Sequence, residues 1–253
     1  MKLLVINPFG VETYNEKIGD ICRKVVRPDT EIVVENNKRG LPFIRHAYFQ
    51  MLMAPDVVEC CIQAEKEGFD GVFISCCFEP GVKEAREVVD IPVVGGSLPG
   101  VFLARQLGQR FGFITDTKRA DAQTYDLFRQ YKLDVEMVAM DSVALGAEDV
   151  ARDPDLNYKR TVELIRNMVQ KGADVVINGC TVVSAYFSTY ETPEDLKKIP
   201  IIDANVASIK TLEMMADLHK TLGMTVSRNI YYQKPQEIEP DAFKLARKVY
   251  GVD

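Results

Sequence analysis

The chain has 253 residues, 47% of them hydrophobic and 27% charged, and a formal net charge of −6. This length suits one large domain or two of roughly 100–150 residues each. The negative charge argues against a nucleic-acid partner, because phosphate binding needs a basic surface, and no apolar run approaches the ~20 residues of a membrane helix. We therefore expect a globular protein whose partner is a small molecule, with no nucleic acid and no membrane.

The six cysteines are expected to be thiols. The apolar run at residues 3–6 is too short for a secretory signal and leads straight into Asn7-Pro8, which predicts a cytoplasmic protein with reduced cysteines. There is no C-x-x-C pair and the two histidines are isolated, so the spacing is not that of a zinc site. Residues 95–100 do not form a dinucleotide fingerprint, since Ser97 occupies the second glycine position. No cofactor is predicted.

Short apolar runs alternate with amphipathic segments along the chain. The first half predicts strands at 1–6, 31–34, 71–75 and 91–94 and helices at 15–26, 55–67, 82–89 and 101–108. The second half predicts strands at 111–115, 134–139, 174–178 and 199–202, helices at 118–131, 157–171 and 205–222, a long loop at 141–155 and a helix after Cys180. Strands that alternate with helices indicate an α/β fold with a mainly parallel sheet in each half.

Two further segments are less regular. Residues 43–53 are apolar and aromatic and fit neither the helix nor the strand pattern. At the C-terminus we expect a short strand at 226–232, a polar linker at 233–240 and an amphipathic helix at 241–250. That helix could dock on the body of the protein or on a partner subunit, and packing as a surface tail is the simpler alternative.

One stretch of the chain is repeated in the second half. Residues 66–77 and 170–180 both read as a helix end, a glycine, an aspartate, an apolar run and a cysteine six residues after the aspartate. The two cysteines, Cys76 and Cys180, are 104 residues apart, and the Ile-Pro pairs that follow them are 108 apart. Two blocks in the same order at nearly the same offset indicate a duplicated half-domain.

The duplication places polar groups at equivalent strand ends. Asn7 and Thr115, 108 residues apart, end the first predicted strand of each half, and Cys76 and Cys180 follow the third. Ligands of open parallel sheets bind beyond the carboxyl ends of the strands. Two halves that face each other would therefore put two cysteines across one cleft.

Two opposed thiols can racemise a carbon acid without a cofactor. A thiolate removes the proton next to a carbonyl, and a thiol on the other face returns one. The thiolate is the reactive form, so its pKa must fall from about 8.5 toward neutral. Both cysteines are predicted between a strand end and a helix start, where helix N-termini stabilise anions. The alternative is a pair of ordinary buried cysteines, and the matched positions favour catalysis.

The neighbouring residues supply the remaining candidates. Cys77 competes with Cys76, but adjacent residues of an extended chain point opposite ways, so we expect Cys77 to pack behind the site. Glu79 and Asp203 are interpreted as helix caps. Asn7 and Thr115 could bind substrate or cap loops, and Thr181 could bind a carboxylate or cap the next helix. The candidate substrate contacts are Asn7, Pro8, Phe9, Cys77, Gly95, Thr115, Gly179 and Thr181.

These motifs resemble the aspartate/glutamate/hydantoin racemase superfamily, and within it the hydantoin racemases. The resemblance covers roughly residues 1–235, and its motifs are Ile6-Asn7-Pro8, Cys76 to Gly81, Ile91 to Gly95, Gly179-Cys180-Thr181 and Pro200 to Asp203. It implies two flavodoxin-like lobes related by pseudo-symmetry, an active site in the cleft between them, a cofactor-independent mechanism and a homo-oligomer. The family's two catalytic cysteines fall on Cys76 and Cys180. We assign residues 1–97 plus about 206–253 to lobe one and 98–205 to lobe two.

The departures bear on the substrate. Phe9-Gly10 stands where hydantoin racemases usually have Asn and then Thr or Ser, and Glu79 stands where they have Asp. The apolar Phe9 favours a larger or more hydrophobic substituent. Our first hypothesis is a racemase or epimerase of a 5-substituted hydantoin or a related amino-acid derivative. The alternatives are an amino-acid racemase, a maleate-type cis-trans isomerase or a decarboxylase on the same fold, and a small-ligand-binding protein without activity.

Overall fold

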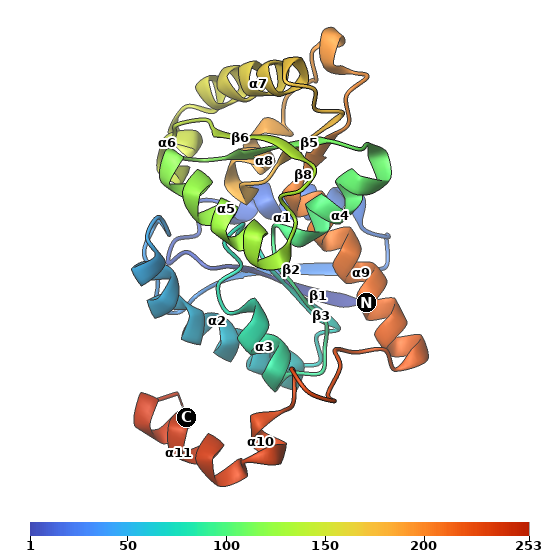
Figure 1. Cartoon of the computed structure of the whole chain (residues 1–253). Coiled ribbons are helices and arrows are strands. Elements are labelled where there is room, and N and C mark those ends of the chain that lie inside the picture. The colour runs from blue at the N-terminus through green and yellow to red at the C-terminus, as the bar shows by residue number, and fades with distance from the viewer. Residues whose placement is uncertain (253) are drawn as a thin grey trace.

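Eight parallel strands form two four-stranded sheets in the computed structural model, which describes residues 1–252 (Figure 1). The first sheet has the order β2-β1-β3-β4 and the second β6-β5-β7-β8. The strands are β1 (Lys2–Asn7), β2 (Glu31–Asn36), β3 (Gly71–Ile74), β4 (Val93–Val94), β5 (Phe111–Thr115), β6 (Met137–Ser142), β7 (Val175–Asn178) and β8 (Ile201–Asp203). Ile6 is paired with Ile74 in the first sheet, and the equivalent Ile114 with Asn178 in the second. The predicted α/β fold with two pseudo-symmetric lobes is thereby confirmed.

Helices cover both sheets. They are α1 (Asn15–Val25), α2 (Ala47–Lys66), α3 (Val82–Val88), α4 (Leu98–Leu107), α5 (Lys118–Tyr131), α6 (Ala147–Arg152), α7 (Pro154–Gln170), α8 (Thr181–Phe187), α9 (Ala204–Leu222), α10 (Pro235–Ile238) and α11 (Pro240–Tyr250). The central strands β3 and β7 are buried at every position, as predominantly apolar strands in parallel sheets usually are. In α1, Ile18 and Cys22 lie four residues apart on the buried face.

Two helices cross between the lobes. Helix α4 follows β4 of the first sheet but packs on β7 and β8, where Val101 and Ala104 join the core around Phe113. Helix α9 follows β8 of the second sheet but packs on β3 and β4, and Leu212 lies in one core with Phe73. This exchange favours the predicted division of the chain near residues 97 and 206, which stays a prediction.

Some local elements differ from expectation. Helix α2 begins at Ala47 and contains Pro55, which we had placed at the helix start. A proline inside a helix removes one N–H bond and crowds the carbonyl four residues earlier, and α2 nevertheless continues through Pro55. The long loop at 141–155 contains α6, and at its start the Gly146 N–H donates to the Asp149 carboxylate at 3.3 Å. Strand β6 starts three residues later than predicted, and residues 226–232 form turns where we expected a strand.

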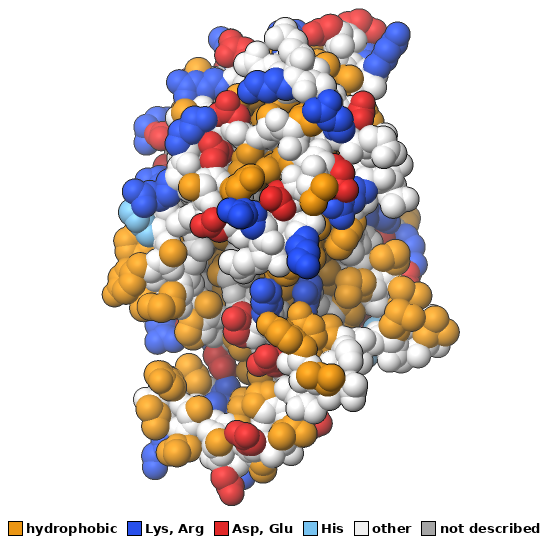
Figure 2. Space-filling view, viewed as in Figure 1, with side chains coloured by type: hydrophobic (Ala, Val, Ile, Leu, Met, Phe, Trp, Pro, Cys, Tyr) orange, Lys and Arg blue, Asp and Glu red, His pale blue; other side chains and the backbone are white. Residues whose placement is uncertain are grey.

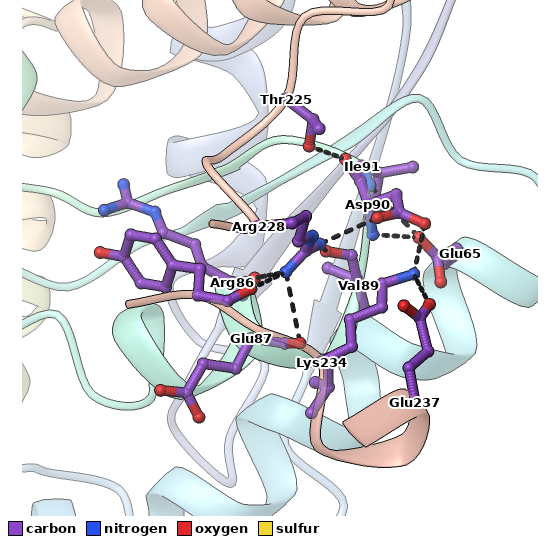
Figure 3. Close-up of polar contacts among 12 residues, drawn as sticks. Glu65, Arg86, Glu87, Val89, Asp90, Ile91, Thr225, Arg228, Lys234 and Glu237 are labelled. Carbon is purple, nitrogen blue, oxygen red and sulfur yellow. Dashed lines mark hydrogen bonds and ion pairs between the residues drawn. The ribbon is translucent and has the colours of Figure 1, made fainter. Parts of the chain in front are cut away.

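The C-terminal segment, residues 225–252, forms an arm that is held to the first lobe by polar contacts (Figure 3). Arg228 donates to the carbonyl oxygen of Arg86 at 2.8 Å and pairs with Asp90 at 2.9 Å, and Lys234 also pairs with Asp90. The last carbonyl groups of a helix have no partner within the helix, so Arg228 caps the end of α3. These contacts attach the start of the arm to the end of α3.

The last helix of the arm, α11, has no buried residue and lies at the end of the molecule, next to α2 (Figure 1). Arg247 of α11 forms a bidentate ion pair with Glu59 of α2, at 2.6 and 2.9 Å. A groove of about 890 Å³ lies between α11 and α2, with Leu52 and Val58 on one side and Phe243 on the other. In Figure 2 apolar side chains gather on the arm and on the nearby body, with a hollow between them. The role of this helix in a homo-oligomer stays a prediction.

Within residues 1–252, no helix is both long and apolar enough to cross a membrane. The same residues contain no group of three or more His, Cys, Asp or Glu side chains placed to hold a metal ion together.

Candidate active site

The two cysteines singled out by the duplication line the same cavity. Cys76 follows β3, and Cys180 follows β7 as the residue that precedes α8. The cavity wall comes from both lobes, and its residues are Phe9, Phe43, Ile44, Arg45, Cys76, Cys77, Phe78, Asp116, Ala147, Cys180, Thr181 and Val182. Its volume of about 30 Å³ holds one or two waters and no organic ring. A substrate can therefore enter only after some of these side chains move.

The start of α8 surrounds the Cys180 sulfur with donors. The backbone N–H groups of Val182 and Val183 point at this sulfur and favour its thiolate. Burial acts in the opposite direction and is the larger effect, and the negative charge of Asp116 adds to it, so the pKa of Cys180 is raised. We had expected a lowered pKa from the helix start alone. In the resting cavity Cys180 is a protonated thiol, which is the form that an acid needs.

Cys77 does not pack behind the site as expected. It lines the cavity, and a hydrogen bond between its thiol and Cys76, together with burial, raises its pKa well above the usual value. The expectation assumed an extended chain, but the Cys76 N–H donates to the Ile74 carbonyl at 2.8 Å. Such a bond across two residues makes a tight turn, and the alternation of side chains ends there.

Thr181 connects the two cysteine segments. Its hydroxyl donates to the carbonyl oxygen of Ser75 at 3.0 Å, directly before Cys76. The Asn205 side chain donates to the Thr181 carbonyl at 2.9 Å and to the Ser184 hydroxyl at 3.0 Å. These groups are buried, and satisfied buried networks fix a unique arrangement. Thr181 thus lines the cavity while its hydroxyl holds the lobes together.

The other predicted contacts divide into two groups. Phe9 lines the cavity, whereas Asn7, Pro8, Gly95, Thr115 and Gly179 do not. The polar side chains among them bond to neighbours in their own lobes. The Asn7 amide donates to Asn15 at 2.7 Å, and the Thr115 hydroxyl donates to Asp121 at 2.5 Å.

The two predicted glycines are required by packing. A Cβ atom on Gly179 would lie 1.9 Å from the ring of Phe113, and one on Gly95 would lie 2.4 Å from the Glu79 carboxyl carbon. Neither position could carry a side chain without displacing its neighbour.

Glu79 and Asp203 cap the two crossing helices in different ways. Asp203 accepts from the N–H groups of Asn205 and Val206 at the start of α9, which confirms it as an N-cap. Glu79 was expected to cap a helix, and it accepts from the N–H groups of Ser97 and Leu98 at the start of α4. Its carboxyl group occupies the space that the missing side chain of Gly95 leaves. Burial raises the pKa of Glu79, and these hydrogen bonds act against that rise.

Two charged residues of the cavity, Arg45 and Asp116, were not identified from the sequence patterns. Arg45 comes from the segment that fitted no pattern. Its guanidinium lies 4.7 Å from the centre of the Phe43 ring and pairs with Glu148 of α6 in the other lobe. Asp116 directly follows β5, so the rule that strand ends carry ligand-binding residues could have identified it. Burial raises its pKa to about 6, while hydrogen bonds from Thr117 and the charge of Arg45 act against the rise.

Comparison with known proteins places the chain among racemases. The model of the family Asp/Glu/Hydantoin racemase matches residues 3–212. A hydantoin racemase of Pseudomonas sp. (strain NS671) is 30% identical over 240 residues, which are 94% of each chain. The structure of allantoin racemase from Klebsiella pneumoniae superposes with a TM-score of 0.83 at 26% identity, over 93% of this chain and 94% of the other. The maleate isomerase Iso from Pseudomonas putida S16 shares the fold, with a TM-score of 0.65 at 15% identity over 86% and 93% of the two chains.

Proposed function

The chain belongs to the Asp/Glu/Hydantoin racemase family and is an isomerase of the racemase class, and we propose that it inverts a carbon acid with Cys76 and Cys180 as its two catalytic residues. The observation that carries this proposal is the position of the two thiols. They occupy equivalent places in two equivalent half-domains, and they line one small cavity at the boundary of the lobes.

The proposed reaction is a proton transfer across the plane of the substrate. The Cys76 thiolate removes the proton next to the carbonyl, and the Cys180 thiol, protonated in the resting cavity, donates a proton to the opposite face. The reaction leaves a thiol on Cys76 and a thiolate on Cys180, which is the state that accepts the other enantiomer. In that state the N–H groups of Val182 and Val183 stabilise the Cys180 thiolate.

The cavity lining supports a ring with an apolar substituent. Phe9, Phe43 and Phe78 supply aromatic surface, while Arg45 and Asp116 supply one donor and one acceptor. A 5-substituted hydantoin has ring carbonyls, ring N–H groups and a side chain that match this set. Two proteins similar to this chain are named for hydantoin and allantoin racemisation. We therefore propose a 5-substituted hydantoin or a related amino-acid derivative as substrate.

The test is incubation in deuterium oxide with a panel of single-enantiomer hydantoins, allantoin, amino acids and α-substituted acids. Proton NMR follows loss of the α-proton, and chiral chromatography follows the enantiomer ratio. We expect exchange together with racemisation for at least one 5-substituted hydantoin. Racemisation of amino acids alone, or a stable thioether adduct with maleate and no exchange, would overturn the substrate class.

A further inference from the structure

We infer that Asp116 accepts a hydrogen bond from the N–H group beside the reacting carbon of the substrate, and that this hydrogen bond reduces the repulsion between the Asp116 carboxylate and a thiolate on Cys180. This inference rests on the proposed function, whose substrate has such an N–H. Asp116 would thereby select the substrate, and substrate binding would at the same time make the Cys180 thiol easier to ionise.

The first support is the position of Asp116. It follows β5, at the position equivalent to Pro8 after β1, and it lines the cavity with both cysteines. The hydroxyl of Thr117 donates to one carboxyl oxygen, Oδ1, at 3.3 Å. The guanidinium in the cavity wall, Arg45, forms its ion pair with Glu148. Asp116 thus has no strong cationic partner of its own among the residues that line the cavity.

The second support is the effect of this carboxylate on its neighbours. After burial, the charge of Asp116 is the largest cause that raises the pKa of Cys180, and it also raises the pKa of Cys77. The groups that face Asp116 are the thiols of these two cysteines, the Thr117 hydroxyl and N–H, and Arg45. Since the pKa of Asp116 is about 6, the group is mostly anionic at pH 7.5. An empty cavity therefore holds a charge that opposes thiolate formation on Cys180.

The third support is chemical complementarity. An ionised carboxylate only accepts hydrogen bonds, so a substrate group that pairs with Asp116 must be a donor. In a hydantoin the N1–H group is attached to the carbon that loses its proton. Pairing of N1–H with Asp116 leaves the carbonyl oxygens to donors such as Arg45. A buried carboxylate that loses one of its donors is costly, so the site should discriminate against substrates without this N–H.

The substrate half of the inference is tested with methylated analogues of the best hydantoin. The N1-methyl and N3-methyl derivatives add the same volume, but only the first removes the N–H beside the reacting carbon. For the wild type we expect kcat/KM to fall at least about tenfold with N1-methylation and less with N3-methylation. In Asp116→Leu, which keeps a similar branched shape without an acceptor, the ratio between the two analogues should approach one. An unchanged ratio in this variant would show that the discrimination is steric and would overturn the inference.

The charge half is tested without turnover. Iodoacetamide alkylation of Cys180 at pH 8.5, measured by peptide mass spectrometry, reports the thiolate fraction, and each unit by which the pKa falls raises the rate about tenfold. Asp116→Asn, which keeps a carbonyl acceptor but not the charge, should react several-fold faster than the wild type. Asp126→Asn removes the same charge from an exposed position on α5 and should react as the wild type does. The buried Cys22 is the internal control for a general opening of the structure.

These outcomes separate the two proposals. A wild type that is inert toward every compound of the panel contradicts the proposed function, and the alkylation rates then still test the effect of Asp116 on Cys180. An active wild type with equal Cys180 alkylation in Asp116→Asn, or with an unchanged analogue ratio in Asp116→Leu, contradicts this inference alone.

Discussion

The hydroxyl of Thr181 donates a 3.0 Å hydrogen bond to the carbonyl oxygen of Ser75, so the residue after one cysteine holds the residue before the other. The bond joins the first residue of α8 to the chain that follows β3, and therefore joins the two lobes at the cavity. The bond therefore helps to set the relative position of the two thiols.

Removal of this hydroxyl should impair catalysis more than stability. Thr181→Val keeps the shape of the side chain but leaves the Ser75 carbonyl without its donor, which we expect to cost about 1–2 kcal/mol in the free energy of unfolding. Displacement of the thiols should lower kcat about tenfold or more. Thr181→Ser, which retains the hydroxyl, is the control. Equal kcat in Thr181→Val and wild type would show that the lobes are positioned by other contacts.

The contact between Glu79 and Gly95 predicts a non-additive pair of mutations. Gly95→Ala forces a Cβ against the Glu79 carboxyl group and should destabilise the protein by about 1–3 kcal/mol. Glu79→Ala removes the acceptor of the Ser97 and Leu98 N–H groups and should cost a similar amount. Because the second change also removes the clash, the double variant should be more stable than the sum predicts by at least about 0.5 kcal/mol. Urea unfolding of the four proteins checks this, and strict additivity would contradict it.

Glu213 of α9 should make stability depend on pH. Burial raises the pKa of this carboxyl group. It accepts from the Arg27 N–H at 3.0 Å and the Thr30 hydroxyl at 2.7 Å, and these bonds, with its ion pair to Lys210, outweigh burial and lower the pKa to about 2. A carboxyl group with a lowered pKa stabilises the folded state above its unfolded pKa of about 4.5, and this contribution is lost as the pH falls from there toward 2.

Glu213→Gln should therefore destabilise the protein by about 2–3 kcal/mol at pH 7, and less at pH 3.5. Urea unfolding at both pH values is the measurement. Glu194→Gln breaks the exposed pair with Lys197 and should change stability by less than about 1 kcal/mol. A Glu213→Gln difference that is the same at both pH values would show that the carboxylate charge does not stabilise α9.

The ion pair between Arg45 and Glu148 should help to keep the cavity closed, because it joins a segment of lobe one to α6 of lobe two. In Glu148→Gln we expect KM to rise about two- to fivefold, as loss of a partly exposed ion pair allows, and alkylation of Cys76, Cys77 and Cys180 to become faster. Arg152→Gln breaks an exposed pair with Asp149 on the same helix and serves as control. Slower alkylation in Glu148→Gln than in the control would mean that the pair holds the cavity open.

The sequence alone allowed prediction of the strands and of the cysteine pair, because both follow from local patterns and from one repeated offset. Equal offsets in a duplicated half-domain give equal topological positions, so Cys76 and Cys180 had to follow equivalent strands. The turn at Cys76 could not be predicted, since the bond from its N–H to Ile74 leaves no trace in the residue pattern. For that reason the prediction that Cys77 packs behind the site was wrong.

The charged residues at the cavity could not be predicted from the sequence for a different reason. Arg45 and Glu148 belong to segments with no strong helix or strand period, and their pairing depends on how the two lobes meet. Asp116 was adjacent to a predicted strand end, but nothing in the local sequence distinguishes a cavity residue from a loop cap there. Contacts between the lobes depend on the tertiary structure, and the spacing of apolar residues along the chain does not show them.

The central claim is that two thiols act on opposite faces of one carbon, and it is tested most directly by single-cysteine variants with both enantiomers of the best substrate. Racemisation is followed in each direction for wild type, Cys76→Ser, Cys180→Ser and the neighbour control Cys77→Ser. We predict that Cys76→Ser and Cys180→Ser each abolish racemisation in both directions, while Cys77→Ser retains measurable turnover. Full activity in either Cys76→Ser or Cys180→Ser, in a folded protein, would contradict the two-thiol account.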